Sequence, residues 1–132
     1  MCLIPYANSE FKVADKDIVC YKVVEKRANG IYKSPYVGFE YVIRVTYKDS
    51  VRCDYTERYE ITKGMFHSYV RRTDAYKQCK EWNEIYEPML EYRVLKCIIP
   101  KGSVYIVGFV SSQFALSYAS QEIKILEELC IH

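Results

Sequence analysis

Three consecutive residues, His67, Ser68 and Tyr69, are the one place in this sequence where side chains of catalytic type stand together. An imidazole can act as a general base, and serine and tyrosine hydroxyls can donate or accept hydrogen bonds at a reacting group. A fourth polar candidate, Glu122, precedes the apolar run IKIL. The competing interpretation is structural: His67 is held by a local turn, and Glu122 is a solvated residue at the start of a strand.

The spacing of the glycine, histidine and cysteine residues does not indicate a phosphate site, a metal site or a reactive thiol. The five glycines are too scattered to form a phosphate cradle. His67 and His132 are the only histidines, and the six cysteines contain no CxxC pair, so we expect neither a metal site nor a cofactor. A cysteine nucleophile with His67 as its base stays open as an alternative, although no local motif selects one thiol.

The cysteines and the first residues indicate the environment of the protein. Cys20 and Cys97 lie within apolar runs, where a thiol behaves as a small hydrophobe. The opening MCLIPYANSEF has too short an apolar run for a secretory signal, and no run approaches the roughly 20 residues that span a bilayer. We therefore expect free thiols in a cytoplasmic protein that is not bound to a membrane.

Tyrosine is unusually frequent, with fourteen Tyr against five Phe and one Trp. Such amphipathic rings suit a binding surface, although they also suit ordinary strands. Nineteen basic against seventeen acidic residues give a net charge of +2, which is too balanced for a dedicated nucleic-acid binder. The candidates for binding a partner or ligand lie in the loop near Asn29-Gly30, in a basic pair and around the turn at Gly102: Tyr32, Tyr36, Arg71, Arg72, Lys101 and Tyr105.

The elements that must position these residues form one domain, 1–132. The run from Tyr92 to Phe109 predicts two central strands joined as a hairpin at Pro100–Ser103. Further strands are expected at 18–24, where both faces are buried, at 37–47, 59–62, 65–70 and 123–131, and a loop or a helical turn at 110–120.

One principal helix is expected at about 73–87, with Thr73 as its N-cap and Pro88 after its end. Ala75, Cys79, Trp82 and Tyr86 recur at helical spacing, and Trp82 is expected to anchor the helix on the sheet. The fold class is therefore α+β, a mainly antiparallel twisted sheet of about six strands with this helix packed on one face.

Several segments together resemble a known group of sequences. KGMFHSY at 63–69, KCIIPKGSVY at 96–105, SYASQEIKIL at 117–126 and DIVCYKV at 17–23 are similar to a family of short uncharacterised proteins from gut Bacteroidota and their phages. The resemblance covers most of the chain and carries no established activity. It implies a bacterial or phage-encoded protein in a bacterial cytoplasm.

A fold-level analogy to ADP-ribosyltransferases gives the catalytic candidates a possible use. In those enzymes a hydroxyl residue ends a strand before a helix, and a glutamate opens a late strand. Ser68 with Tyr69, and Glu122, can be placed on these positions, whereas the first strand offers only Lys22 as a basic residue. This analogy concerns fold and does not establish a function.

We interpret the protein as a small, non-enzymatic accessory protein of phage or prophage type. It is expected to bind a host or defence protein, or a small nucleotide-like ligand, through a tyrosine-rich surface, and a homo-oligomer stays open. One alternative is a nucleotide-using, ADP-ribosyltransferase-like enzyme with His67, Ser68, Tyr69 and Glu122 in its site. A further alternative is a structural component of a virion.

Overall fold

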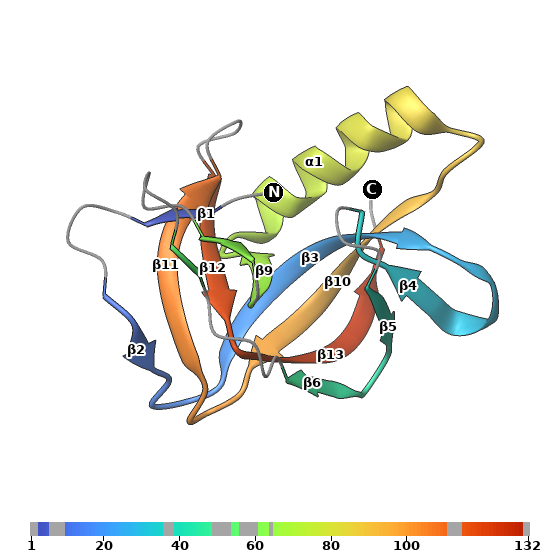
Figure 1. The fold of residues 1–132 in the computed structure, drawn as a ribbon. Helices are drawn as coiled ribbons and strands as arrows, with labels where there is room; N and C mark the ends of the chain where they lie inside the picture. The colour runs from blue at the N-terminus through green and yellow to red at the C-terminus, as the bar shows by residue number, and fades with distance from the viewer. Residues whose placement is uncertain are drawn as a thin grey trace.

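A computed structural model of the chain describes residues 3–5, 10–35, 39–48, 54–55, 61–63, 65–110 and 115–130. These residues form one sheet of thirteen strands and one α-helix that packs on it (Figure 1). Ten of the strands follow the order β6-β13-β10-β3-β9-β12-β11-β1-β8-β7, β2 pairs with β11, and β4 pairs with β3 and β5. All strand pairs within these ranges are antiparallel. The predicted α+β class is confirmed.

The strands are β1 (Leu3–Pro5), β2 (Lys12–Val13), β3 (Ile18–Lys26), β4 (Ile31–Lys33), β5 (Glu40–Val42), β6 (Thr46–Lys48), β7 (Asp54–Tyr55), β8 (Ile61–Lys63), β9 (Phe66–Tyr69), β10 (Tyr92–Ile99), β11 (Val104–Val110), β12 (Ala115–Ser120) and β13 (Glu122–Leu129). The helices are the 3-10 turn η1 (Ala28–Gly30) and α1 (Arg72–Tyr86). The strands outnumber the six expected because the run at 37–47 is divided into β5 and β6 and because β1, β2, β4, β7 and β12 lie outside the ranges where strands were predicted.

The sheet buries apolar side chains on both faces of its central strands. Cys20, Val24, Leu95 and Cys97 belong to one cluster, the inner core, which faces away from α1. Residues of the opposite parity, such as Val23 on β3 and Val94 on β10, belong to a second cluster under α1, the helix-side core. This division explains why nearly every residue at 18–24 is apolar, as the sequence predicted.

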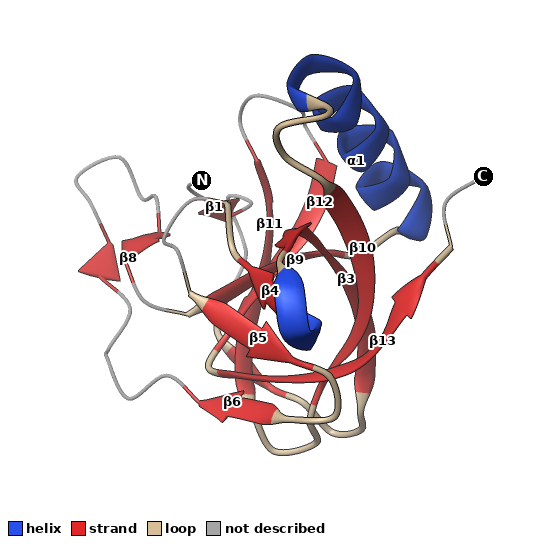
Figure 2. Cartoon of the chain, turned by 90° about the vertical axis from the view of Figure 1, so that its right-hand side faces the viewer, coloured by secondary structure: helices blue, strands red, loops and turns tan. Residues whose placement is uncertain are grey.

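Helix α1 lies across the outside of the curved sheet (Figure 2). It begins at Arg72, after Arg71 as N-cap, and no side chain caps it. The N-cap predicted at Thr73 is therefore wrong, whereas the helix itself is confirmed to within one residue at each end. Ala75 and Cys79 are fully buried in the helix-side core.

The hairpin predicted at Pro100–Ser103 is wrong, although both of its strands exist. β10 pairs with β3 on one edge and β13 on the other, so no edge is left for β11, which pairs with β12, β1 and β2. The turn is tied instead to the β2–β3 connection, because Gly102 N donates to Ala14 O at 2.8 Å and Lys101 N donates to Asp17 Oδ1 at 2.9 Å. Gly102 has φ 91°, the positive value that the turn was expected to need.

Two other expectations are corrected. The strand predicted at 37–47 is broken by a turn at Arg44, whose φ is 70°, so that β5 and β6 are separate. The loop predicted at 110–120 contains strand β12, which lies between β11 and β9. Its small polar residues misled the prediction because they are buried with their hydroxyls bonded: Ser117 Oγ donates to Ala115 O at 3.0 Å, and Ser120 Oγ donates to Glu122 O at 3.0 Å.

Candidate functional site

The three neighbouring catalytic candidates lie on the short strand β9. Alternation along the strand places Ser68 with Phe66 toward the inner core, while Tyr69 belongs to the helix-side core. His67 has the parity of Tyr69, so its side chain leaves the strand on the face opposite to Ser68. Ser68 and Tyr69 are 4% and 3% exposed. The strand geometry therefore does not direct His67 and Ser68 at one reacting atom.

The fourth candidate, Glu122, is held elsewhere. Ser103 Oγ donates to Glu122 Oε2 at 2.7 Å, and Lys48 Nζ lies 3.9 Å from Glu122 Oε1. His67 pairs across the ladder with Ala119, whereas Glu122 follows beyond the bend at Gln121. The ladder does not bring this carboxylate opposite the β9 candidates.

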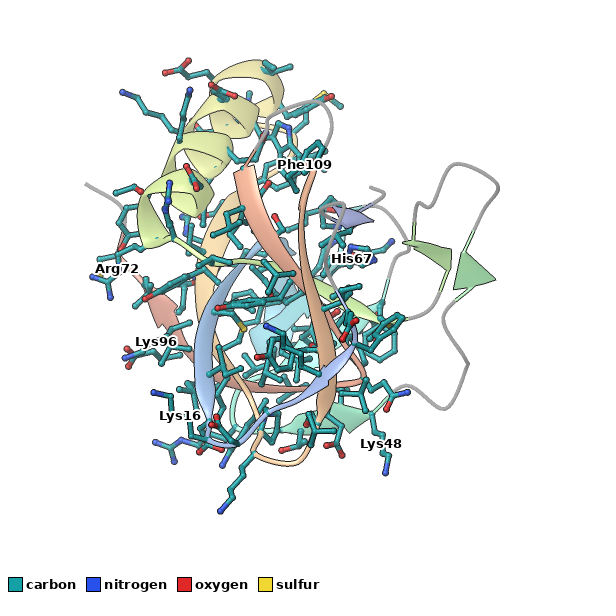
Figure 3. All side chains as sticks on the ribbon, turned by 90° about the vertical axis from the view of Figure 1, so that its left-hand side faces the viewer. Lys16, Lys48, His67, Arg72, Lys96 and Phe109 are labelled. Carbon is teal, nitrogen blue, oxygen red and sulfur yellow. The ribbon has the colours of Figure 1, made fainter. Side chains whose placement is uncertain are left out.

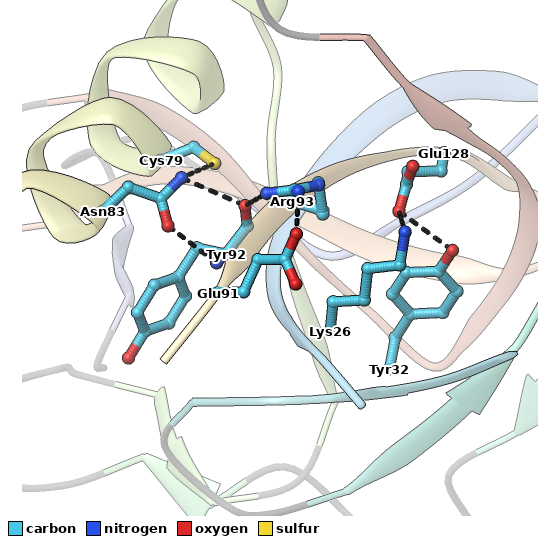
Figure 4. Close-up of polar contacts among 8 residues, drawn as sticks. All are labelled: Lys26, Tyr32, Cys79, Asn83, Glu91, Tyr92, Arg93 and Glu128. Carbon is cyan, nitrogen blue, oxygen red and sulfur yellow. Dashed lines mark hydrogen bonds and ion pairs between the residues drawn. The ribbon is translucent and has the colours of Figure 1, made fainter. Parts of the chain in front are cut away.

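The predicted binding residue Tyr32 is a core residue, so its expected exposure is wrong. It is 7% exposed, and its hydroxyl donates to Glu128 Oε1 at 3.0 Å, where Lys26 Nζ also lies at 3.3 Å (Figure 4). Burial raises the pKa of Tyr32, and the bond to Glu128 adds to this shift. Tyr36 lies outside the described residues. A binding role for either tyrosine stays a prediction.

The other predicted binding residues come from separate elements. The Arg72 guanidinium carbon lies 5.8 Å from the Tyr21 ring centroid and 5.9 Å from that of Tyr76, beside the exposed Arg71. Lys101 is exposed in the turn after β10, and Tyr105 is half-buried against Tyr118, at 5.9 Å between ring centroids. Figure 3 shows the Arg72 and His67 side chains apart from each other, although Arg71 follows Tyr69 after one residue and Tyr21, which Arg72 contacts, pairs with Tyr69 across the sheet.

Tyrosine does not form the expected surface in the part of the chain that the structure describes. Ten tyrosine side chains are described there, and Tyr86 is the one that is exposed. The others pack in the two cores or against their edges. The tyrosines therefore behave mainly as strand and core residues, which was the competing interpretation.

A polar group that the sequence did not single out lies in the inner core. Lys22 is 7% exposed, donates from Nζ to the carbonyl oxygen of His67 and lies 5.2 Å from the Tyr41 ring centroid. Cys20 and Cys97 face each other across β3 and β10, and both are fully buried. Cys20 and Lys22 are two residues apart, so a strand at 18–24 would direct both side chains to the same face. The apolar residues around them made this pairing hard to recognise in the sequence.

The chemistry of this group is that of a packed core. Burial raises the pKa of Cys20 to about 11, although the Ser68 hydroxyl and the Lys22 charge act in the opposite direction. Burial raises the pKa of Cys97 as well, and the neighbouring Cys20 adds to it. Such thiols stay protonated at neutral pH and are poor nucleophiles and ligands. Across the described residues, no group of three or more His, Cys, Asp or Glu side chains could hold a metal ion.

Three exposed large apolar side chains lie at or just past the C-terminal end of α1, and two of them, Ile85 and Met89, are the most exposed of this type among the described residues. Ile85 is 69% exposed, Tyr86 46% and Met89 89%. Ala75, Cys79, Trp82 and Tyr86 form one apolar stripe along α1, Ile85 lies beside the end of this stripe, and Met89 follows three residues after the helix ends. Figure 1 shows this end of α1 extending beyond the sheet. We call residues 82–89 the overhang.

The overhang is held firmly in place from below. Asn83 Nδ2 donates to Tyr92 O at 3.1 Å, and Tyr92 N donates to Asn83 Oδ1 at 2.8 Å, so one amide satisfies both backbone groups at the start of β10 (Figure 4). The Tyr92 ring lies 5.2 Å from the Trp82 ring and 6.0 Å from the Tyr86 ring, between centroids. The position of the overhang is thus fixed before any contact with a partner.

Comparison of the chain with family models, curated proteins and solved structures gives no match. None of the described helices is long and apolar enough to cross a membrane. The candidate site therefore rests on the geometry of this chain alone, and the overhang is its clearest feature.

Proposed function

We propose that this chain is a small, non-enzymatic binding protein that contacts another protein through the overhang of α1. The observation that carries the proposal is the exposure of Ile85, Tyr86 and Met89 at the end of a stripe whose first members, Ala75 and Cys79, are buried. Clustered exposed apolar side chains mark interaction sites, and Trp, Tyr and Met are enriched among them.

The rigidity of the overhang supports a binding role. The two hydrogen bonds between Asn83 and the Tyr92 backbone, with the ring contacts of Trp82 and Tyr86, set its orientation in the free protein. A preformed surface loses less conformational entropy on association than a flexible one. A partner could therefore dock on Ile85 and Met89 without reordering the helix.

The resemblance to proteins of Bacteroidota and their phages supports the class of partner. An accessory protein of phage or prophage type, acting in a bacterial cytoplasm, would use this surface on a host or defence protein. Among the described residues, Glu122 is bonded to Ser103, and His67 and Ser68 leave β9 on opposite faces, which gives less support to the enzyme alternative with His67, Ser68, Tyr69 and Glu122 in one site. A virion component would use the overhang to contact other capsid or tail proteins.

Site-specific photocrosslinking tests the proposal. A photoreactive phenylalanine analogue is placed at Ile85 and, as a control, at Val13 on β2, which is 64% exposed. In a bacterial lysate we expect a discrete adduct from position 85 that excess wild-type protein abolishes and excess Ile85→Asp does not. Equal adducts from both positions, or competition by Ile85→Asp, would contradict a binding role for the overhang.

A further inference from the structure

We infer that the partner presents an apolar pocket flanked by lysine or arginine side chains, an inference that rests on the proposed function. It concerns the charges around the overhang, which the apolar stripe alone does not explain. Three exposed carboxylates, Glu81, Glu84 and Glu87, lie close to Ile85 and Met89 in the sequence. We call these three residues the acidic rim.

The acidic rim makes no ion pair within the described part of the chain, and the nearest lysines on α1, Lys77 and Lys80, lie one turn before Glu81 and Glu84. No ion pair joins Glu81, Glu84 or Glu87 to a described lysine or arginine, whereas Glu91 pairs with Arg93. The stretch from Glu81 to Glu91, EWNEIYEPMLE, contains four glutamates and neither lysine nor arginine. The exposed apolar side chains therefore stand in a region of local negative charge, although the whole chain has a net charge of +2.

The position of the rim is unfavourable for the helix itself. The C-terminal end of a helix carries partial negative charge, so cationic side chains stabilise it and carboxylates do not. The last turn of α1 contains no basic residue, and Glu84 and Glu87 lie at that end. Helix stability therefore does not account for these carboxylates, whereas a cationic partner would be attracted by both the carboxylates and the helix end.

The same charges argue against other occupants. A symmetric contact between two copies would bring the acidic rims of both chains together, and like charges across an interface oppose association. Nucleic acid and the surfaces of anionic lipid membranes are also negatively charged. A protein with an apolar pocket and a basic rim is the partner that matches both the stripe and the charge.

A displayed library of random twelve-residue peptides provides the probe. Peptides are selected on the immobilised wild-type protein and counter-selected on Ile85→Asp, which changes an exposed side chain and should stay folded by circular dichroism. We expect enriched peptides that combine large apolar residues with lysine or arginine. Their affinity is then measured for the wild type and for a triple variant, Glu81→Gln, Glu84→Gln and Glu87→Gln.

The triple variant should bind these peptides about tenfold more weakly at low salt, because three exposed charge pairs are lost. Raising the salt concentration should weaken wild-type binding and leave the triple variant nearly unchanged. A matched control is Glu10→Gln, a single exposed carboxylate outside α1, which should bind as the wild type does.

The outcomes separate the inference from the proposed function. Peptides that depend on Ile85 but lack basic residues, or that bind the triple variant unchanged, overturn the acidic-rim inference and leave the binding role intact. If no peptide distinguishes the wild type from Ile85→Asp, both fail. Sedimentation that shows a wild-type dimer abolished by Ile85→Asp would replace the basic partner with a second copy of the chain.

Discussion

The two halves of α1 carry the same apolar stripe and meet different surroundings. In the first half Ala75 and Cys79 are fully buried: both are 0% exposed and lie in the helix-side core. In the second half Ile85 is 69% exposed, and Met89, three residues past the helix end, is 89% exposed. Trp82 stands between them, half-buried against Tyr92. Amphipathic spacing therefore shows which face of a helix is apolar and not how much of that face the fold covers.

The difference arises from the length of the sheet relative to that of the helix. A helix of 15 residues is about 22 Å long, and the sheet beneath α1 is built mainly from β3, β9 and β10. β10 begins at Tyr92, where Asn83 is bound. Beyond Asn83 the Tyr86 ring still contacts Tyr92, whereas Ile85 is 69% exposed to solvent.

The largest effect is expected in the covered half. Ala75→Glu would place an unpaired carboxylate in the helix-side core and should lower the free energy of unfolding by about 3 to 5 kcal/mol. A carboxylate in the first turn of a helix stabilises the helix by only about 0.3 to 1 kcal/mol, which is less than the cost of burying the charge. Denaturant unfolding followed by Trp82 fluorescence measures the change. A loss below about 1 kcal/mol would mean that Ala75 is not covered.

The residue between the halves should have an intermediate effect. Trp82→Ala should cost about 2 kcal/mol, roughly half of what deleting a fully buried tryptophan costs, because the ring is half-buried. Thermal unfolding followed by circular dichroism gives the value. Trp82→Phe, which keeps an aromatic ring against Tyr92, is the control and should lose less. A cost equal to that of Ala75→Glu would place Trp82 wholly in the covered half.

Of the two halves of α1, the covered half is the one expected to make the free energy of unfolding depend on pH. Burial raises the pKa of Cys79 from 9.0 to about 11, an effect that Arg93 and Asn83 partly oppose. Because the folded-state pKa is the higher one, the stabilising contribution is complete below pH 9 and is lost as the pH rises toward 11. Between these values the free energy of unfolding should fall less steeply in Cys79→Ala than in the wild type. Cys130→Ala, which changes an exposed thiol, should keep the wild-type slope.

Sequence reasoning succeeded where local pattern decides the structure. The continuous apolar run at 18–24 predicted burial on both faces, and the spacing of Ala75, Cys79 and Trp82 predicted α1. It failed where partners distant in sequence decide, as in the pairing of β10 with β3 instead of β11. The strand at 115–120 was missed because buried serines satisfy their hydroxyls within the sheet, which composition cannot reveal.

The site shows the same division. The apolar stripe, the residues Ile85 and Met89 near its end and the neighbouring glutamates can be recognised in the sequence. Their exposure could not be, because it depends on where β10 begins and on the Asn83 contact. The hydroxyl and imidazole neighbours at 67–69 attracted attention by type, but strand alternation sends adjacent side chains to opposite faces.

The contact between Asn83 and Tyr92, which joins α1 to the sheet, should contribute a smaller amount to the free energy of unfolding. Asn83→Ala removes two hydrogen bonds and leaves the N–H and C=O of Tyr92, a buried residue, without those partners. We expect a loss of about 1 to 2 kcal/mol in the free energy of unfolding. Hydrogen exchange should also become faster at the Tyr92 amide. An unchanged exchange rate there would show that the Asn83 contact does not hold the overhang.

The smallest effect on stability is expected in the uncovered half, where Ile85→Glu introduces the same side chain as Ala75→Glu. Ile85 already faces solvent, so the new carboxylate stays hydrated and the free energy of unfolding should change by less than about 0.5 kcal/mol. Glutamate has a slightly higher helix propensity than isoleucine, which favours the folded state. A carboxylate near the C-terminal end of a helix is slightly unfavourable, so these two small effects oppose each other. Binding to any partner that docks on the overhang should nevertheless be lost, because a charge would enter the centre of the contact. The measurement pairs denaturant unfolding with the peptide-binding assay. A loss of several kcal/mol would show that this end of α1 is covered in solution, and the contrast between the two halves would then be wrong.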